Sequence, residues 1–250
     1  MQEPQPLPGP ALTRLARFGR VHLLDTVTST NDRAFELASS REPALVVARR
    51  QTKGRGRFRR EWFSDEGSLT FSLLQFPTDP AQLDAITNVI GLALARALAT
   101  ATGVEPRIRW PNDITVKDRK LCGILCERRR DAVAIGVGLN VNQAAFPEDL
   151  PDAVSLFQLT GRSFVGLELL DPILDEYTAL MASVAENGTE KLMQEVKQRS
   201  SVLHRRVEVS TLLRRHVGTV VDIDGAGRIV LRADNGRIVV LSSGQARRLA

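Results

Sequence analysis

The segment spanning residues 109–127 constrains the fold most, because it reads as a β-hairpin with a lysine and a glycine in its second strand. Two runs of mixed apolar and polar residues flank a charged turn at residues 117–119. A glycine inside a strand weakens it unless a ligand or another backbone must come close there. Lys120, three residues before Gly123, is therefore well placed to meet an anion. On this segment alone, a charged hairpin with a bulge glycine explains the pattern equally well.

Composition places the chain among ordinary globular proteins. Its 250 residues are 43% hydrophobic and 25% charged, which allows a sizeable core in one large domain, or in one domain plus a small module. The net charge of +5 suits an anionic ligand without requiring nucleic acid. The two cysteines, Cys122 and Cys126, do not have the spacing of a metal or redox pair, and they fit a reducing cytosol.

The N-terminal segment contains several prolines and reads as a flexible lead over residues 1–19, with a short helix at 11–19. It has neither the basic nor the apolar region of a secretory signal. No run of 18 apolar residues predicts a membrane-spanning helix.

Hydrophobic periodicity predicts an α+β protein with two parts. In the first part we expect helices at 32–39, 80–102, 167–186 and 189–199, and further strands at 22–27, 44–48, 68–74 and 132–141. From residue 202, short strands are expected at 206–211, 217–223, 228–233 and 237–241. The Asn-Gly turn at residues 235–236 is a strong hairpin signal, and the second part is predicted to be a small β-barrel.

Two polar clusters are candidate binding sites. Ser29, Thr30 and Asn31 precede a helix, where such residues most often serve as N-caps but also offer hydroxyls and free N–H groups to a ligand. The segment at 54–57, Gly-Arg-Gly-Arg, offers guanidinium groups that bind carboxylate or phosphate with paired hydrogen bonds. It is neither a Walker A loop nor a dinucleotide fingerprint, and a solvated basic loop or a nucleic-acid patch would have the same composition.

No hydrolytic triad, metal cluster or carboxylate pair stands out. His22, His204 and His216 are scattered and are interpreted as surface or packing residues. The chemistry must therefore come from positive charge and positioning, as in nucleotidyl transfer.

Five stretches in order and spacing resemble biotin protein ligases, over about residues 20 to 250. They are residues 28–31, 51–62, 109–113, 118–127 and 136–142. The resemblance implies a mixed sheet like that of class II aminoacyl-tRNA synthetases, with helices packed on one side, followed by an SH3-like barrel. The domains would be a lead at 1–19, a catalytic domain at 20–201 and the barrel at 202–250.

The resemblance also implies a reaction. Such enzymes form biotinyl-5′-AMP from biotin and ATP with Mg²⁺, and then transfer biotin to one lysine of a biotin carboxyl carrier domain. A cytoplasmic location is implied, a homodimer is compatible with it, and membrane or DNA binding is not expected. The resemblance is to the monofunctional type, in which no helix-turn-helix DNA-binding domain is expected before residue 20.

Site residues carry over by position. Lys120, Arg55 and Arg57 would be catalytic, and the arginines belong to a loop that closes over the intermediate. Biotin would contact Ser29, Thr30, Asn31, Gln51, Gly54, Arg55, Gly56, Arg57, Lys120, Gly123 and Leu125. ATP would contact Arg55, Trp62, Asn112, Lys120 and Asn140, with Asp113 orienting its neighbours. No metal ligands are assigned.

Some positions depart from the family pattern. Arg59 stands where a loop glycine is usual, and Asp65 stands where a proline is usual. Arg109 replaces a frequent lysine, Cys122 replaces a frequent alanine, and Gln245 lies near a frequent glutamate of the barrel.

Two alternatives stay open. A lipoate or octanoyl transferase has a related fold, and some of these enzymes use a cysteine nucleophile; however, both cysteines lie in an apolar strand, where thiols are usually inert. A nucleic-acid-binding protein using the basic loop is the second alternative, and it would show steep salt dependence.

Overall fold

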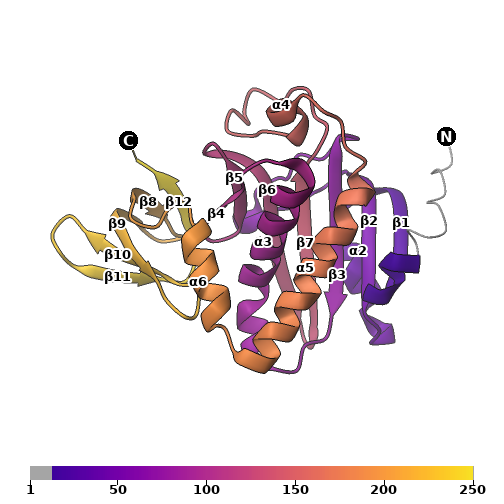
Figure 1. Ribbon diagram of the computed structural model, residues 1–250, viewed down its shortest axis with the longest axis horizontal. Helices are drawn as coiled ribbons and strands as arrows, with labels where there is room; N and C mark the ends of the chain where they lie inside the picture. The colour runs from indigo at the N-terminus through magenta and orange to yellow at the C-terminus, as the bar shows by residue number, and fades with distance from the viewer. Residues whose placement is uncertain (1–12, 250) are drawn as a thin grey trace.

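The computed structural model describes residues 13–249 (Figure 1). Residues 1–12 of the predicted lead lie outside this range. Within the described part of the lead, a helical turn continues into η1 (Ala16–Phe18). Leu15 is 2% exposed in the main core, and Arg17 forms an ion pair with Asp171 at 2.9 Å. Residues 13–19 thus pack against the larger domain.

A seven-stranded mixed sheet forms the larger domain, as predicted. Its order is β1-β2-β3-β7-β6-β5-β4, with β1 and β2 parallel and the other neighbours antiparallel. The strands are β1 (Arg20–Val27), β2 (Ala44–Gln51), β3 (Ser68–Gln75), β4 (Arg107–Arg109), β5 (Asp113–Val116), β6 (Arg119–Arg129) and β7 (Ala132–Asn140). The predicted hairpin of residues 109–127 is present as β5 and β6, with β4 added at the sheet edge.

Helices cover both faces of this sheet, so the expectation of helices on one side is wrong. The long helices α3 (Pro80–Thr102) and α5 (Gly166–Asn187) lie side by side on one face (Figure 1). The short α2 (Thr30–Glu36) packs with Val46 and Leu74 in a separate core cluster. Their strand neighbours Leu45 and Leu73 belong to the main core. Because successive residues of a strand point to opposite faces, α2 lies on the other face.

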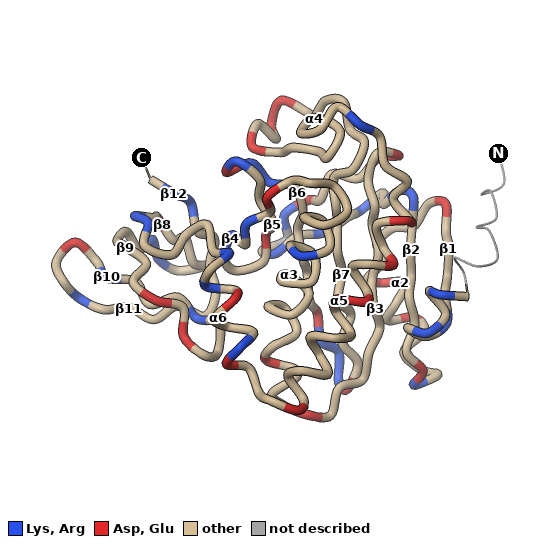
Figure 2. Tube along the Cα trace, in the orientation of Figure 1, with Lys and Arg blue, Asp and Glu red and all other residues tan. Residues whose placement is uncertain are grey.

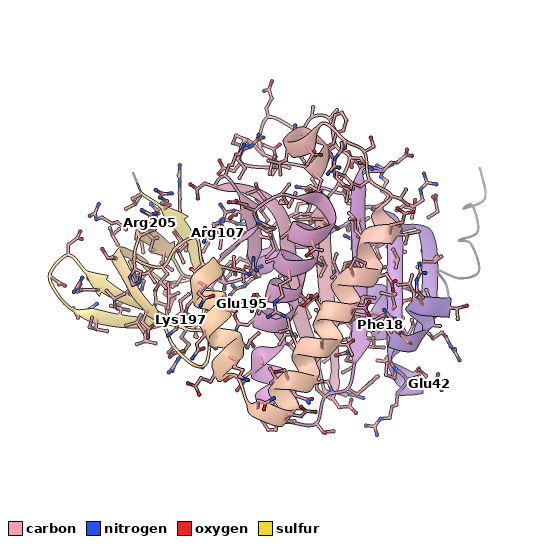
Figure 3. The ribbon with its side chains drawn as sticks, in the orientation of Figure 1. Phe18, Glu42, Arg107, Glu195, Lys197 and Arg205 are labelled. Carbon is pink, nitrogen blue, oxygen red and sulfur yellow. The ribbon has the colours of Figure 1, made fainter. Side chains whose placement is uncertain are left out.

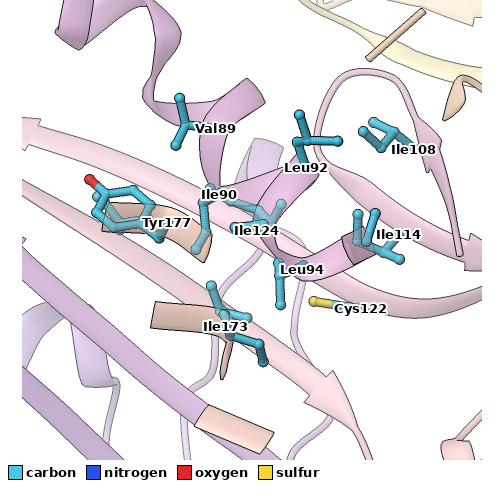
Figure 4. Close-up of a cluster of buried hydrophobic side chains, with 14 of the residues drawn as sticks. Val89, Ile90, Leu92, Leu94, Ile108, Ile114, Cys122, Ile124, Ile173 and Tyr177 are labelled. Atoms are coloured by element: carbon cyan, nitrogen blue, oxygen red, sulfur yellow. The ribbon is translucent and has the colours of Figure 1, made fainter. Parts of the chain in front are cut away.

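The main core lies between the sheet and the pair α3 and α5 (Figure 4), and it continues into the C-terminal domain through buried residues such as Val207 and Val220. Helix α3 has the predicted bounds. At its start, the side chain of Asp79 accepts a 2.9 Å hydrogen bond from the N–H of Ala81, and at its end Gly103 has a φ of +77°. Among the described residues, α3 is the one helix long and apolar enough to cross a membrane. Most of it is buried, so its composition is that of a core helix.

Two short helices complete the larger domain. α4 (Leu156–Thr160) begins with a capping box formed by Ser155 and Gln158. α6 (Glu190–Arg199) leads toward the C-terminal domain, and Lys197 binds Asp222 of that domain at 2.7 Å. Lys197 and Arg107 lie near the junction of the two domains (Figure 3).

The C-terminal domain is an antiparallel sheet with the order β11-β10-β9-β8-β12. Its strands are β8 (Arg206–Ser210), β9 (Arg215–Ile223), β10 (Ile229–Ala233), β11 (Ile238–Leu241) and β12 (Gln245–Arg248). Four of them follow the predicted ranges closely, whereas β12 was missed because it has only one apolar residue, Ala246. Closure into a barrel stays a prediction, since β11 and β12 are the two edges of this order.

Candidate active site

A cavity of about 290 Å³ lies where the ends of β2, β6 and β7 meet the loop at 54–62. The segments at 109–113 and 244–246 contribute to its walls. All but one of the predicted site residues line it: Ser29, Thr30, Asn31, Gln51, Arg55, Gly56, Arg57, Trp62, Asn112, Lys120, Gly123, Leu125 and Asn140. The exception is Gly54, which is buried at the start of the loop, where a Cβ would lie 2.7 Å from the carbonyl oxygen of Trp62.

Glycines form the floor of the cavity. Gly138 of β7 pairs with Gly123 of β6, and the indole of Trp62 packs directly over both. A Cβ at Gly123 would lie 3.1 Å from that ring and 3.3 Å from Nζ of Lys120, and one at Gly138 would overlap the ring. At Gly136, two residues earlier on β7, a Cβ would overlap the side chain of Asn31. The close approach predicted at Gly123 is therefore made by side chains of this chain.

One end of the floor carries uncharged hydrogen-bonding groups, beside the ion pairs of Arg55; Nδ2 of Asn31 donates to Glu127 at 2.8 Å. Oε1 of Gln51 accepts from the backbone N–H of Thr30 at 2.7 Å and from its hydroxyl at 3.1 Å. Oγ of buried Ser72 lies 2.7 Å from Oγ1 of Thr30 and 2.6 Å from Oδ1 of Asn31. Ser29 occupies the N-cap position of α2 but makes no side-chain capping bond. The capping interpretation thus does not account for this cluster, which joins α2 to the sheet.

The other end of the floor is cationic. Nζ of Lys120 lies 2.7 Å from Oδ1 of Asp113, whose Oδ2 lies 3.2 Å from the guanidinium of Arg109. The same Nζ lies 5.5 Å from the centre of the Trp62 ring, within cation–π range. Arg57 reaches the cavity from the loop, and burial lowers the pKa of its guanidinium below the ordinary value. Two cations thus share one carboxylate here, and Arg57 adds a third positive charge.

Hydrogen bonds within the loop at 54–62 fix its shape, and the ion pairs of Arg55 hold it against the sheet domain. The N–H of Gly56 donates to the carbonyl of Arg60 at 2.8 Å, and the N–H of Trp62 donates to that of Gly54 at 2.9 Å. The guanidinium of Arg55 contacts both oxygens of Asp32 and lies 3.5 Å from Glu127.

Asp32 also receives a 3.0 Å hydrogen bond from Arg129. Hydrogen bonding from Arg55, reinforced by Arg129, holds the pKa of Asp32 below its ordinary value of 3.8 despite partial burial. One acidic residue thus holds two arginines, one from the loop and one from β6.

The two asparagines predicted to contact ATP bind the backbone. Nδ2 of Asn112 donates to the carbonyl of Ile124 at 2.6 Å, and Nδ2 of Asn140 donates to that of Val154 at 3.1 Å. These bonds hold β6 and the segment that follows β7 in place around Lys120. The side-chain amides therefore already have protein partners.

The cysteines serve as packing residues. Cys122 is fully buried in the core (Figure 4), and burial raises the pKa of its thiol. Burial raises the pKa of Cys126 to about 11. Neither thiol lines the cavity, and although Cys126 is partly exposed, its raised pKa keeps it protonated near neutral pH, unlike the thiolate of a nucleophile.

Some lining residues were not predicted as site residues. Gly136 and Gly138 alternate on one face of β7, a signal that the sequence contains. Gly244 and Gln245 come from the C-terminal domain, and the carbonyl of Gly244 accepts a 3.5 Å hydrogen bond from Arg57. This contact joins segments far apart in the sequence and left no local signal.

Comparison with known proteins is consistent with this geometry. Residues 23–142 match the model of the Biotin/lipoate A/B protein ligase family, and residues 203–246 match that of the Biotin protein ligase C terminal domain. The bifunctional ligase/repressor BirA of Bacillus subtilis is 32% identical over 229 residues, covering 86% of this chain and 70% of that protein. The biotin–[acetyl-CoA-carboxylase] ligase of Paracoccus denitrificans is 31% identical over 231 residues, covering 87% and 96%.

Solved structures give the same result. The biotin protein ligase of Aquifex aeolicus in complex with biotin and ATP superposes with a TM-score of 0.81 at 29% identity. The match covers 92% of this chain and 99% of that one.

Proposed function

Since this chain belongs to the biotin/lipoate A/B protein ligase family, we propose that it is an ATP-dependent biotin protein ligase. In the first step, an oxygen of the biotin carboxylate bonds to the α-phosphorus of ATP, and pyrophosphate leaves. In the second step, the amine of a carrier lysine attacks the mixed anhydride; an amide bond forms, and AMP leaves with the electron pair of the broken C–O bond. The enzyme needs no nucleophile of its own.

One observation carries the assignment of roles: the glycine floor joins an uncharged polar end to a cationic end. Biotin has the matching form, with a neutral ureido ring at one end and a carboxylate at the other. We assign the ureido ring to Ser29, Thr30 and Gln51, and the carboxylate to Lys120. Between them, we assign Gly123 and Leu125 to line biotin with backbone groups, and the ring of Trp62, which lies over Gly123 and Gly138, would move aside as biotin enters.

The charges account for how the first step can proceed. A carboxylate and a phosphate about 4 Å apart repel each other by roughly 4 kcal/mol per pair of unit charges at an effective dielectric near 20. Lys120 and Arg57 supply positive charge at this end of the cavity, and their charge would offset the repulsion as the two anions approach. Arg55 would contribute through the same loop, which excludes water from the anhydride when it covers the cavity.

The nucleotide would lie beside the cationic end. We assign Trp62 to the adenine side, and Asn112 and Asn140 to holding the backbone that faces the nucleotide. In residues 13–249, no group of three His, Cys, Asp or Glu side chains could hold a metal ion. We propose that Mg²⁺ binds with ATP, through the phosphates of the nucleotide.

The proposed acceptor is a biotin carboxyl carrier domain, and the proposed location is the cytoplasm. The related lipoate or octanoyl transfer reaction is less well supported, because residues 203–246 match the Biotin protein ligase C terminal domain and the relatives compared above are biotin ligases.

Biotin-dependent exchange of labelled pyrophosphate into ATP tests the first step. We expect exchange with biotin and none with octanoate or lipoate; the reverse result would overturn the proposal. Mass spectrometry of a carrier domain incubated with protein, biotin, ATP and Mg²⁺ tests the second step through the mass increase of one biotinyl group.

A further inference from the structure

Two leucines at the tip of the β8–β9 hairpin are far more exposed than apolar side chains usually are. Leu212 is 82% exposed and Leu213 is 92% exposed. The other exposed large apolar side chains among the described residues reach at most 58%. An isolated surface leucine needs no explanation, but two adjacent ones at a projecting turn have a solvation cost that a partner would remove.

The turn presents these leucines in a defined arrangement. The N–H of Thr211 donates to the carbonyl of Arg214 at 2.8 Å, and the Thr211 hydroxyl donates to the same carbonyl at 2.9 Å. That hydroxyl oxygen in turn accepts from the N–H of Arg214 at 3.1 Å. Hydrogen bonds thus close the turn across the leucines, which reduces the entropy that binding a partner would cost.

The tip lies close to the wall of the active-site cavity that the C-terminal domain supplies. Ser210, the last residue of β8, pairs with Gln245 of β12, and both Gln245 and Gly244 line the cavity. A Cβ at Gly244 would lie 3.1 Å from the carbonyl oxygen of Ser210. Leu212 follows two residues later, so its Cα is within about 7 Å of that of Ser210. A protein that delivers a lysine to this cavity along the wall formed by Gly244 and Gln245 would pass close to the leucines.

Exposed arginines surround the tip. Arg214 and Arg215 follow the leucines directly, and Arg247 projects from the neighbouring strand β12. The acidic residue nearby, Glu208, lies 3.9 Å from Arg215. Lys and Arg positions are frequent at the β8 and β12 end of the sheet (Figure 2). This surface favours a partner with acidic residues around an apolar patch.

We propose that Leu212 and Leu213 form a docking contact for the carrier domain. The contact would fit a folded acceptor domain that bears an apolar patch and acidic side chains beside its acceptor lysine. This inference rests on the proposed function, because it supplies the partner for the second step. It assigns no role to the leucines in the first step, which involves only small molecules.

The test is the double variant L212S/L213S, assayed as the full chain. We expect the KM for a folded carrier domain to rise about tenfold, a change of about 1.4 kcal/mol, with kcat little changed. Pyrophosphate exchange with biotin and ATP should stay at the wild-type rate, as should biotin transfer to free lysine supplied at high concentration. The charge reversal R214E should raise the KM for the carrier in the same direction.

The matched control is I238S/V240S. Ile238 and Val240 are 53% and 48% exposed on β11, the opposite edge of the same sheet. This variant should leave the KM for the carrier unchanged.

An unchanged KM for the carrier in L212S/L213S would overturn the inference while leaving the proposed function intact. Two other results would also overturn it. If L212S/L213S abolished self-association in sedimentation experiments, the leucines would bind a second copy of this chain. If it abolished binding to vesicles containing anionic lipid, they would bind a membrane. If the wild type shows no biotin-dependent exchange, the proposed function fails and this inference fails with it.

Discussion

The ammonium nitrogen of Lys120 lies 2.7 Å from Oδ1 of Asp113, and both side chains face the cavity. Arg109 approaches the other oxygen of the same carboxylate at 3.2 Å. Asp113 thus fixes the position of the amine that we assign to the biotin carboxylate. The Trp62 ring packs over Gly123 and Gly138, beside the Lys120 side chain.

Removal of the Lys120 charge should slow the first step strongly without unfolding the protein. Loss of one preorganised group that stabilises transition-state charge costs about 10²- to 10³-fold in rate, and we expect a loss of this size in pyrophosphate exchange for K120Q. K117Q, which removes an exposed lysine from the turn of the same hairpin, should retain exchange. Near-normal exchange by K120Q, with circular dichroism unchanged in both variants, would contradict the assigned role.

Replacement of Asp113 by asparagine should separate binding from catalysis. The amide keeps the shape of the side chain but no longer attracts Lys120, so kcat for adenylation should fall about tenfold, corresponding to about 1.4 kcal/mol. The cavity gains one net positive charge, so the KM for ATP should fall rather than rise. D118N, at an exposed aspartate two residues before Lys120, is the control. A higher KM for ATP in D113N would show that the carboxylate has another role.

A methyl group at Gly138 should displace the indole of Trp62. Overpacking of this kind costs about 1–3 kcal/mol, so G138A should lower the free energy of unfolding by that amount. G225A is the control, because a Cβ there would have nothing within 4 Å.

A double-mutant cycle of G138A with W62A measures how strongly Gly138 and Trp62 interact. In a W62A background, G138A should cost much less than it does alone, since the two residues touch and their effects do not add. Thermal or denaturant unfolding of the four proteins in this cycle measures the coupling. Additive effects would show that the indole does not rest on Gly138.

Asp32 should make stability depend on pH at the acid end. Its folded-state pKa is lower than the ordinary 3.8, so its contribution is fully present above about pH 3.8 and is lost as the pH falls through the folded-state value. D32N should therefore be less stable than the wild type at pH 7, by about 1 kcal/mol for a partly exposed carboxylate paired with two arginines. The difference should shrink below pH 3.8. A difference that stays constant down to pH 2 would exclude the ion pairs as its cause.

A control for this experiment is D131N. Asp131 pairs with Arg41 at the surface, where its side chain is 51% exposed, and its removal should change stability little. If D32N also slows pyrophosphate exchange while D131N does not, the ion pairs of Arg55 affect the loop as well as stability.

The sequence by itself determined the elements whose signals are local. Helix α3 runs from Pro80 to Thr102 as predicted, because its apolar period, its N-terminal Asp-Pro pair and Gly103 are all adjacent in the chain. The hairpin of residues 109–127 and the spacing of Lys120 and Gly123 were predictable for the same reason. The order of the five motifs was sufficient to identify the family.

Only the tertiary structure decided which side chains meet. It placed the Trp62 ring over Gly123 and Gly138, and it brought Gly244 of the C-terminal domain to Arg57. It also put α2 on the opposite face of the sheet from α3, and added β12. These contacts join residues tens of positions apart, and they depend on how strands pair and loops close over them. Hydrophobic periodicity shows only which face of a helix or strand is buried. It does not show which residues elsewhere in the chain that face contacts.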